Sequence, residues 1–90
     1  RASDVIARLG GEEFCVLAPG MSPAHCCDIF DTLRQTIASD PITVDGNAIN
    51  ARISIGLTAT LGPTLEATLD HADQLLYQAK NQGRNRVVFG

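Results

Sequence analysis

The sequence contains no run of about 18 apolar residues, the length that a transmembrane helix needs. It begins without Met and without the pattern of a secretory signal, so we expect a fragment of a longer parent protein. Basic residues are not in excess: the formal net charge is −3, which argues against a surface for nucleic acid or for direct membrane contact. A nucleotide remains a candidate ligand, because a few local cations suffice to bind phosphates.

Cysteine is scarce, and its spacing does not match the common metal and redox motifs. The three cysteines, Cys15, Cys26 and Cys27, form no CxxC pair, and their odd number does not suggest a disulfide framework. Neither His25 nor His71 has a partner at the spacing of a zinc site. We therefore expect reduced thiols that pack like small apolar side chains in a cytoplasmic segment, with any membrane anchor of the parent lying upstream.

The length of 90 residues allows one domain, and we assign residues 1–90 to a single one. Apolar spacing and turn residues predict the order β-β-α-β-β-α-β. Strands are expected over residues 4–9, 14–18, 42–44, 49–61 and 86–89, and helices that begin at Ser22-Pro23 and at Thr64 and end before Pro41 and before Gly83. This order predicts an α/β (α+β) sandwich in which the helices pack against a mostly antiparallel sheet.

The clearest periodic pattern lies over residues 49–61, where apolar residues alternate with mostly polar or small ones. Such alternation predicts one long strand with a single face on a core. Asp45-Gly46, just before it, is a strong signal for a hairpin turn. Phe30 and Tyr77 are expected to pack in the core.

Several short motifs occur in a fixed order along the whole chain. They are RASD at 1–4, GGEEF at 10–14, SIG at 54–56, AD at 72–73, LYQAK at 76–80 and GRN at 83–85. In this order and spacing the chain resembles the GGDEF family of diguanylate cyclases, although GGEEF by itself would be weak evidence. The resemblance implies a nucleotide-cyclase-like palm whose first part is missing. The missing strand would lie between the strand at 14–18 and the strand at 49–61.

The acidic hairpin is the first candidate site. Glycines let the backbone approach a bulky nucleotide, and carboxylates bind Mg²⁺ through oxygen. The resemblance implies that Glu12 is the metal ligand and proton acceptor and that Glu13 contributes beside it, with Mg²⁺ (or Mn²⁺) as cofactor. It also implies that Gly10 and Gly11 shape the turn against the substrate. The alternative is an acidic turn that is only hydrated.

Two cations near the end of the second helix form the next candidate. Lys80 lies in its last turn, and Arg84 follows Gly83. Ammonium and guanidinium groups can hold triphosphate oxygens, and the resemblance assigns both residues to phosphate binding. The alternative is that Lys80 complements the helix dipole and Arg84 is hydrated.

Arg1 and Asp4 form an RxxD pair five residues before Gly10. A guanidinium matches guanine O6 and N7, and a carboxylate can accept from guanine N–H groups. The resemblance implies an inhibitory site for the product, cyclic-di-GMP; the alternative is a surface salt bridge of little worth. Family members with strong product inhibition often carry a further arginine where this chain has Thr32.

The resemblance implies that the parent condenses two GTP into cyclic-di-GMP and pyrophosphate, with two such domains facing one another in a homodimer. The first strand and the helices that read guanine are absent, so we expect the 90-residue chain alone to be inactive. A cyclic-di-GMP receptor without catalysis and a scaffold for dimerisation are the alternatives. Loss of the acids or glycines of the hairpin would favour either one, and the sequence retains them.

Overall fold

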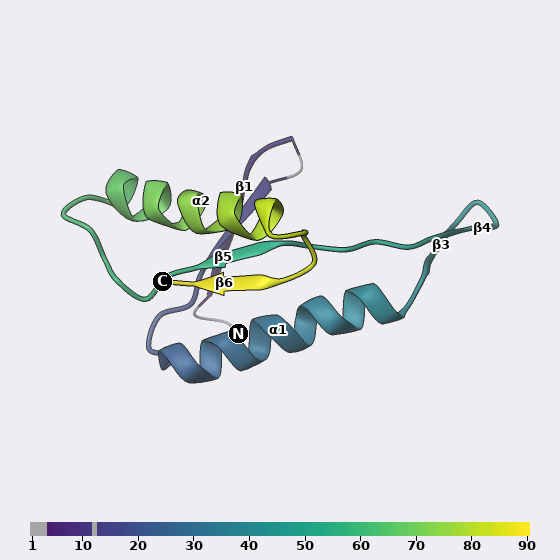
Figure 1. Cartoon of the computed structure of the whole chain (residues 1–90), viewed down its shortest axis with the longest axis horizontal. Coiled ribbons are helices and arrows are strands. Elements are labelled where there is room, and N and C mark those ends of the chain that lie inside the picture. The colour runs from purple at the N-terminus through teal and green to yellow at the C-terminus, as the bar shows by residue number, and fades with distance from the viewer. Residues whose placement is uncertain (1–3, 12) are drawn as a thin grey trace.

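The computed structural model describes residues 4–11 and 13–90 and has a mixed α/β fold, as predicted (Figure 1). The elements in chain order are β1 (Val5–Gly10), β2 (Glu13–Leu17), α1 (Pro23–Ser39), β3 (Ile42–Val44), β4 (Asn47–Ile49), β5 (Ile55–Leu57), α2 (Leu65–Asn81) and β6 (Val87–Phe89). Within the described residues, no helix is both long and apolar enough to cross a membrane.

Strand pairing is mostly antiparallel, as predicted, but the strands do not join into one sheet within the described chain. Antiparallel ladders join β1 to β2 and β3 to β4, whereas β5 pairs with β6 in parallel. Each ladder has two strands, so one long side of each strand has no ladder partner among these residues.

The long strand predicted over residues 49–61 is wrong in its extent. Within this range only Ile49, the last residue of β4, and the three residues of β5 are in strands, and residues 50–54 belong to no strand. The chain leaves β5 where the Thr58 hydroxyl accepts a hydrogen bond from the Thr60 amide at 3.1 Å, a local bond that competes with a ladder. An alternating pattern reports which side chains share a face and carries no information on whether a partner strand is available.

Both helices begin and end where the capping residues predict. The Ser22 hydroxyl accepts a hydrogen bond from the His25 amide at 3.3 Å, and Pro23 occupies the first turn of α1. Thr64 caps α2 in the same way, by accepting from the Ala67 amide at 3.0 Å. The α2 helix has Lys80 in its last turn, where a cation favours the helix dipole.

The two helices cover opposite faces of the β5–β6 ladder (Figure 1). Gly56 permits the close approach of β5 to α2, since an added Cβ would collide with the backbone of Ala72 and Leu76. The only buried apolar side chains of the described residues, Leu75 and Ala79, lie on the face of α2 that meets this ladder. Tyr77 was expected in the core but is 67% exposed, because its position on α2 faces away from the strands.

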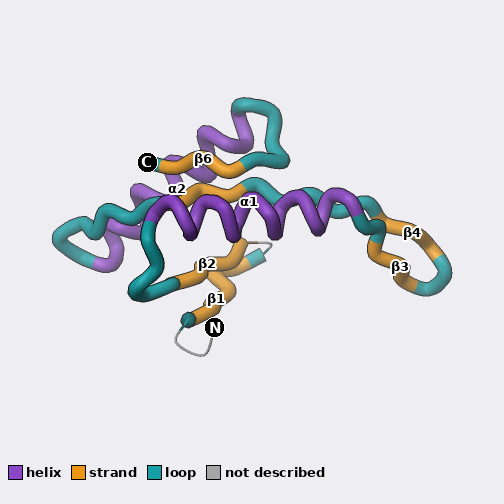
Figure 2. Tube along the Cα trace, turned by 90° about the horizontal axis from the view of Figure 1, so that it is seen from below, coloured by secondary structure: helices purple, strands orange, loops and turns teal. Residues whose placement is uncertain are grey.

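The remaining strands lie outside this central layer. The β1–β2 hairpin lies beside the layer, and the β3–β4 hairpin projects beyond the end of α1 (Figure 2). A hollow of about 1350 Å³ separates β2, β5, α1 and α2. Its walls are mostly apolar, including Phe14, Val16, Phe30 and Leu33, and these four side chains are only partly covered.

Candidate functional site

The glycine turn predicted between residues 10 and 13 is confirmed, with Gly10 opposite Glu13 in the ladder. The φ angles of Gly10 and Gly11 are 136° and 52°, a region that favours glycine. Arg8 secures the turn from the preceding strand, because its Nε and Nη2 donate to the Gly11 carbonyl at 3.0 and 2.7 Å. Arg8 was not among the predicted site residues, and its only signal in the sequence is its place three residues before the second glycine.

Glu13 is the first residue of β2, and the fold brings it to the end of α2. Its Oε1 lies 3.9 Å from the Lys80 Nζ, and the two side chains are 44% and 31% exposed. The structure therefore joins two predicted site residues that are far apart in the sequence. At this distance and exposure the pair contributes little to stability. Glu12, the other predicted acid of the hairpin, lies outside the described residues.

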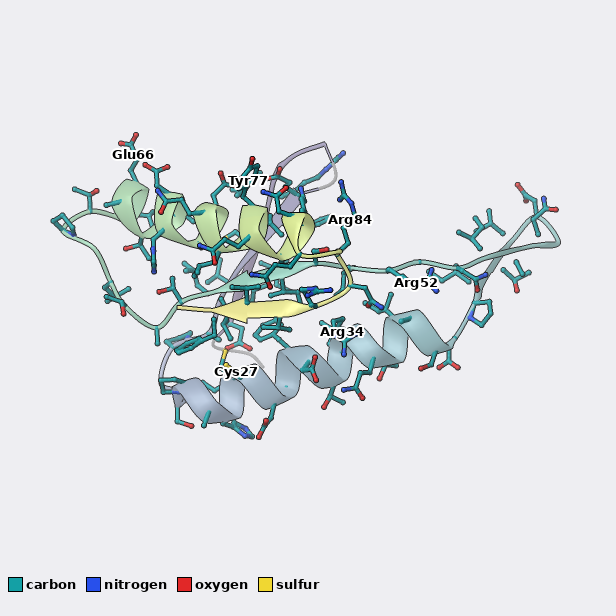
Figure 3. All side chains as sticks on the ribbon, viewed as in Figure 1. Cys27, Arg34, Arg52, Glu66, Tyr77 and Arg84 are labelled. Carbon is teal, nitrogen blue, oxygen red and sulfur yellow. The ribbon has the colours of Figure 1, made fainter. Side chains whose placement is uncertain are left out.

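Arg84 lies in a turn with an unusual backbone. Residues Gly83, Arg84 and Asn85 have φ angles of 119°, 64° and 49°. The Arg84 amide donates to the Ala79 carbonyl at 2.9 Å, which closes the end of α2. The Arg84 side chain is exposed and points away from α1 (Figure 3).

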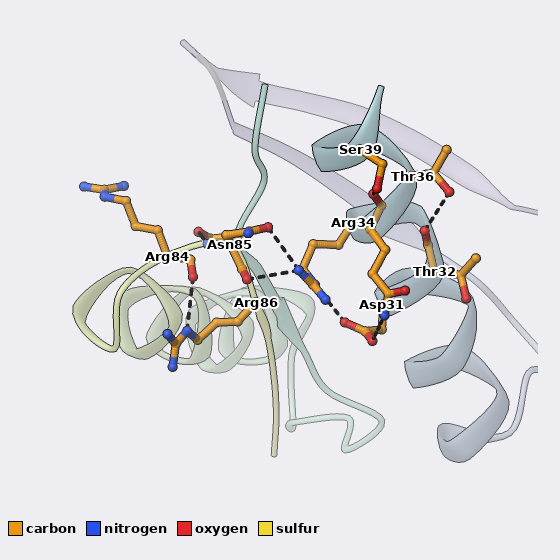
Figure 4. Close-up of polar contacts among 10 residues, drawn as sticks. Asp31, Thr32, Arg34, Thr36, Ser39, Arg84, Asn85 and Arg86 are labelled. Atoms are coloured by element: carbon orange, nitrogen blue, oxygen red, sulfur yellow. Dashed lines mark hydrogen bonds and ion pairs between the residues drawn. The ribbon is translucent and has the colours of Figure 1, made fainter. Parts of the chain in front are cut away.

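A polar cluster that the sequence analysis did not predict links α1 to this turn (Figure 4). The Arg34 Nη1 donates to the Asn85 carbonyl at 3.2 Å and to its Oδ1 at 3.0 Å. The Asn85 amide donates to the Ser54 hydroxyl at 3.1 Å. The Arg34 Nε also donates to Asp31 Oδ1 at 2.7 Å, and this bond lowers the pKa of the Asp31 carboxyl. No sequence pattern could reveal a contact between residues 51 positions apart.

Predicted site residues from β2 and from the end of α2 line the hollow. Glu13, Lys80, Gly83 and Arg84 line it together. Glu13 and Lys80 lie together at the hollow and Arg84 also lines it, so an acid and two cations are present, the group types that suit a metal-bound phosphate chain.

The donor chemistry of this edge fits Mg²⁺ in part. Glu13 supplies a carboxylate oxygen, the donor type that Mg²⁺ prefers, and Mg²⁺ commonly takes only one or two carboxylates beside substrate phosphates and water. In the described part of the chain, no three His, Cys, Asp or Glu side chains gather into a metal cluster. A complete set would need further ligands, Glu12 among them.

The predicted product site is only half within the described residues. Arg1 lies outside them, and Asp4 is half-buried at the residue before β1. Its role stays a prediction.

Comparison with protein families gives one match over almost the whole chain. The model of the family described as "Diguanylate cyclase, GGDEF domain" matches residues 1–86. The chain belongs to the GGDEF domain family. Its mixed α/β fold is thus that of a GGDEF domain.

Named relatives of this GGDEF chain include a response regulator and a diguanylate cyclase. It is 44% identical over 92 residues to the response regulator PleD of Caulobacter vibrioides, covering 98% of this chain and 20% of PleD. It is 42% identical over 88 residues to the diguanylate cyclase DgcP of Pseudomonas aeruginosa, covering 97% of this chain and 13% of DgcP. The chain thus spans a small part of the length of these relatives.

Two solved structures share the fold. The diguanylate cyclase SiaD of Pseudomonas aeruginosa, in complex with its activator SiaC, matches with a TM-score of 0.87 and 31% identity, over 100% of this chain and 35% of that one. The GGDEF domain of DgcB from Caulobacter crescentus, in complex with c-di-GMP, matches with a TM-score of 0.87 and 26% identity, over 99% of this chain and 54% of that one.

Proposed function

We propose that this chain forms one edge of the active site of a diguanylate cyclase domain, in a longer parent that condenses two GTP into cyclic-di-GMP and pyrophosphate. The observation that carries the proposal is that the fold brings Glu13 to within 3.9 Å of Lys80, at a hollow that Arg84 also lines. Family membership supports the same reaction, because named relatives are diguanylate cyclases.

The basic residues bind phosphate, and the acidic residues serve the metal and the proton transfer. Lys80 and Arg84 bind triphosphate oxygens, Arg84 with a planar fork and Lys80 as a point charge. Gly10 and Gly11 let the hairpin approach the nucleotide, and Arg8 keeps the turn in place through the Gly11 carbonyl. Glu12 and Glu13 hold Mg²⁺ (or Mn²⁺), and Glu12 accepts the proton of the attacking 3′-hydroxyl. A metal held by these two carboxylates would supply positive charge to the phosphates.

The reaction needs two GTP, and each domain of the family presents one. We therefore propose that the parent works as a homodimer of GGDEF domains, with the groups that read guanine contributed by parts of the parent outside this chain. The hollow beside β2 and β5 supports a contribution from other parts of the parent, because its apolar walls are uncovered in the described chain.

The direct test is turnover of GTP by the full-length parent with Mg²⁺, followed by chromatography of the products. We expect cyclic-di-GMP from the wild type, and a loss of about 100-fold or more in rate for Glu12→Ala and for Glu13→Ala, as is usual for groups that act on the transition state. Glu66→Ala is the matched control, since Glu66 lies at the opposite end of α2 from Arg84 (Figure 3). Well-folded dimers that bind cyclic-di-GMP but make none would favour the receptor without catalysis.

We further propose product feedback at Arg1 and Asp4. The chemistry of an arginine and an aspartate matches the edge of a guanine. Calorimetric titration of the parent with cyclic-di-GMP tests the site: Arg1→Ala should weaken binding at least tenfold, by loss of a bidentate contact. Arg52→Ala is the control, because Arg52 is an exposed arginine outside the RxxD motif. Equal affinity of the wild type and Arg1→Ala would remove Arg1 from the site.

A further inference from the structure

We propose that Arg34 is a positioning residue for the phosphate site: it holds the turn at residues 83–85 in the conformation from which Arg84 reaches the triphosphate. The inference rests on the function proposed above, because it assigns Arg84 a phosphate to bind. It adds a residue of α1 that lies outside the acidic hairpin, the cation pair and the RxxD motif.

The contacts of Arg34 are with other residues of the chain, so its role is structural and not the binding of a ligand. Its side chain is only 17% exposed, and its Nε is occupied by Asp31 at 2.7 Å. Its Nη1 donates to both the backbone carbonyl and the side-chain Oδ1 of Asn85, at 3.2 and 3.0 Å. One planar guanidinium therefore joins α1 to the residue that directly follows Arg84.

The turn needs such support because of its backbone. Arg84 and Asn85 are consecutive non-glycine residues with φ of 64° and 49°. Residues held in this region persist only where the surrounding structure over-determines them. Asn85 meets that requirement through three groups, since its amide donates to Ser54 and its carbonyl and Oδ1 accept from Arg34.

Arg84 itself is held by its backbone and not by its side chain. Its amide bonds to Ala79 and its carbonyl accepts from the Arg86 Nε at 3.1 Å. Its guanidinium makes no hydrogen bond or ion pair with the rest of the described residues, so it is available for a ligand. The direction of the Arg84 side chain is thus set by the conformation of a turn that Arg34 stabilises.

Loss of Arg34 should therefore weaken GTP binding without changing the chemical step. Arg84 contacts the triphosphate in the ground state and in the transition state, so it stabilises both. Weakening a contact of this kind raises the KM and leaves kcat unchanged. The competing explanation is that Arg34 only stabilises the packing of α1 against the rest of the domain. In that case Arg34→Ala lowers the stability of the parent and leaves the KM for GTP unchanged.

The experiment uses the full-length parent and a mutant cycle of Arg34→Ala, Arg84→Ala and the double variant, with GTP kinetics and thermal unfolding measured for each. We expect Arg34→Ala to raise the KM about tenfold with kcat within about twofold, and the double variant to match Arg84→Ala alone. Arg34→Lys keeps the charge but has no fork, and should retain most of the KM defect. Gln35→Ala is the control on the same helix, because Gln35 bonds Asp31 and not the turn.

Additive effects in the double variant, or a lower unfolding temperature with the KM unchanged, would overturn the proposal. If Arg34→Ala does not fold, the same cycle with Arg34→Lys decides it. Affinity for a non-hydrolysable GTP analogue, measured by calorimetry, provides a readout independent of turnover. If the wild type makes no product, or Arg84→Ala leaves the KM unchanged, the proposed function fails. If Arg84→Ala raises the KM and the Arg34 variants do not, only this inference fails.

Discussion

At the scale of single residues, two arginine side chains stabilise backbone turns through hydrogen bonds. Arg8 donates two hydrogen bonds to one carbonyl in the glycine hairpin, and Arg34 donates two to Asn85 after α2. Both turns carry positive φ angles. A planar guanidinium suits this task because its donors have fixed relative directions, so two bonds restrain both position and orientation.

The ion pair of Arg34 predicts a pH effect on stability. Hydrogen bonds from Arg34, and secondarily from Gln35, lower the pKa of Asp31 below its ordinary value of 3.8. A carboxyl whose pKa is lower in the folded state contributes stability that is fully present above 3.8 and is lost as pH falls through the lowered pKa. The contribution is small, because the Asp31 side chain is 44% exposed.

Titration of Asp31 by NMR in the parent tests this effect. We expect its pKa to rise back toward the ordinary value in Arg34→Ala, and to rise less in Gln35→Ala, since a bond to a charged donor is the stronger one. An Asp31 pKa that is the same in the wild type and in Arg34→Ala would contradict the assignment.

At the scale of elements, the contact between β5 and α2 depends on one glycine. An added Cβ at Gly56 would collide with the Ala72 carbonyl oxygen and the Leu76 amide nitrogen, both of which belong to the helix backbone and cannot turn aside. Gly56→Ala should therefore push α2 away from β5 and destabilise the parent domain by about 3 kcal/mol, at the upper end of overpacking effects.

A matched control separates this collision from backbone conformation. Gly20 has a φ of 74° and open space around the position of a Cβ. Gly20→Ala should cost only about 1–2 kcal/mol, the usual penalty for a left-handed non-glycine residue. Denaturant unfolding of the two variants measures the difference, and a smaller loss for Gly56→Ala than for Gly20→Ala would contradict the packing argument.

At the scale of the whole molecule, the described chain leaves much of its apolar surface uncovered. Its radius of gyration is 13.9 Å, against about 12 Å for a compact domain of this length. Large apolar side chains such as Ile6, Phe14 and Leu33 are 73%, 65% and 45% exposed. The strands beside the hollow, β2 and β5, also have a ladder partner on only one side among the described residues, a state prone to association.

The isolated 90-residue chain should therefore be poorly folded and inactive. We expect it to bind a hydrophobic dye, to unfold without a cooperative transition and to make no cyclic-di-GMP, because it covers too little apolar surface to offset its conformational entropy. The full-length parent, measured in parallel, should unfold cooperatively. A monomeric 90-residue chain with sharp unfolding and measurable GTP turnover would contradict this prediction.

Local chemistry accounts for what could be predicted from the sequence. The N-caps Ser22 and Thr64, the Asp45-Gly46 turn and the glycine hairpin all depend on neighbours within a few residues, and all are confirmed. The ordered motifs were sufficient to predict the GGDEF family, because several of them occur in one order along the whole chain, and the family model matches residues 1–86.

What the tertiary structure decided depends on partners distant in the chain. The strand expected over residues 49–61 is interrupted, because a strand exists only where a neighbour completes its hydrogen bonds. Tyr77 is exposed although helical spacing was compatible with burial. The pairing of Glu13 with Lys80 and of Arg34 with Asn85 required the fold to bring remote segments together. Sequence alone determined the local turns, the caps and the family; only three-dimensional packing determined which charged side chains meet, since those contacts have no local cause.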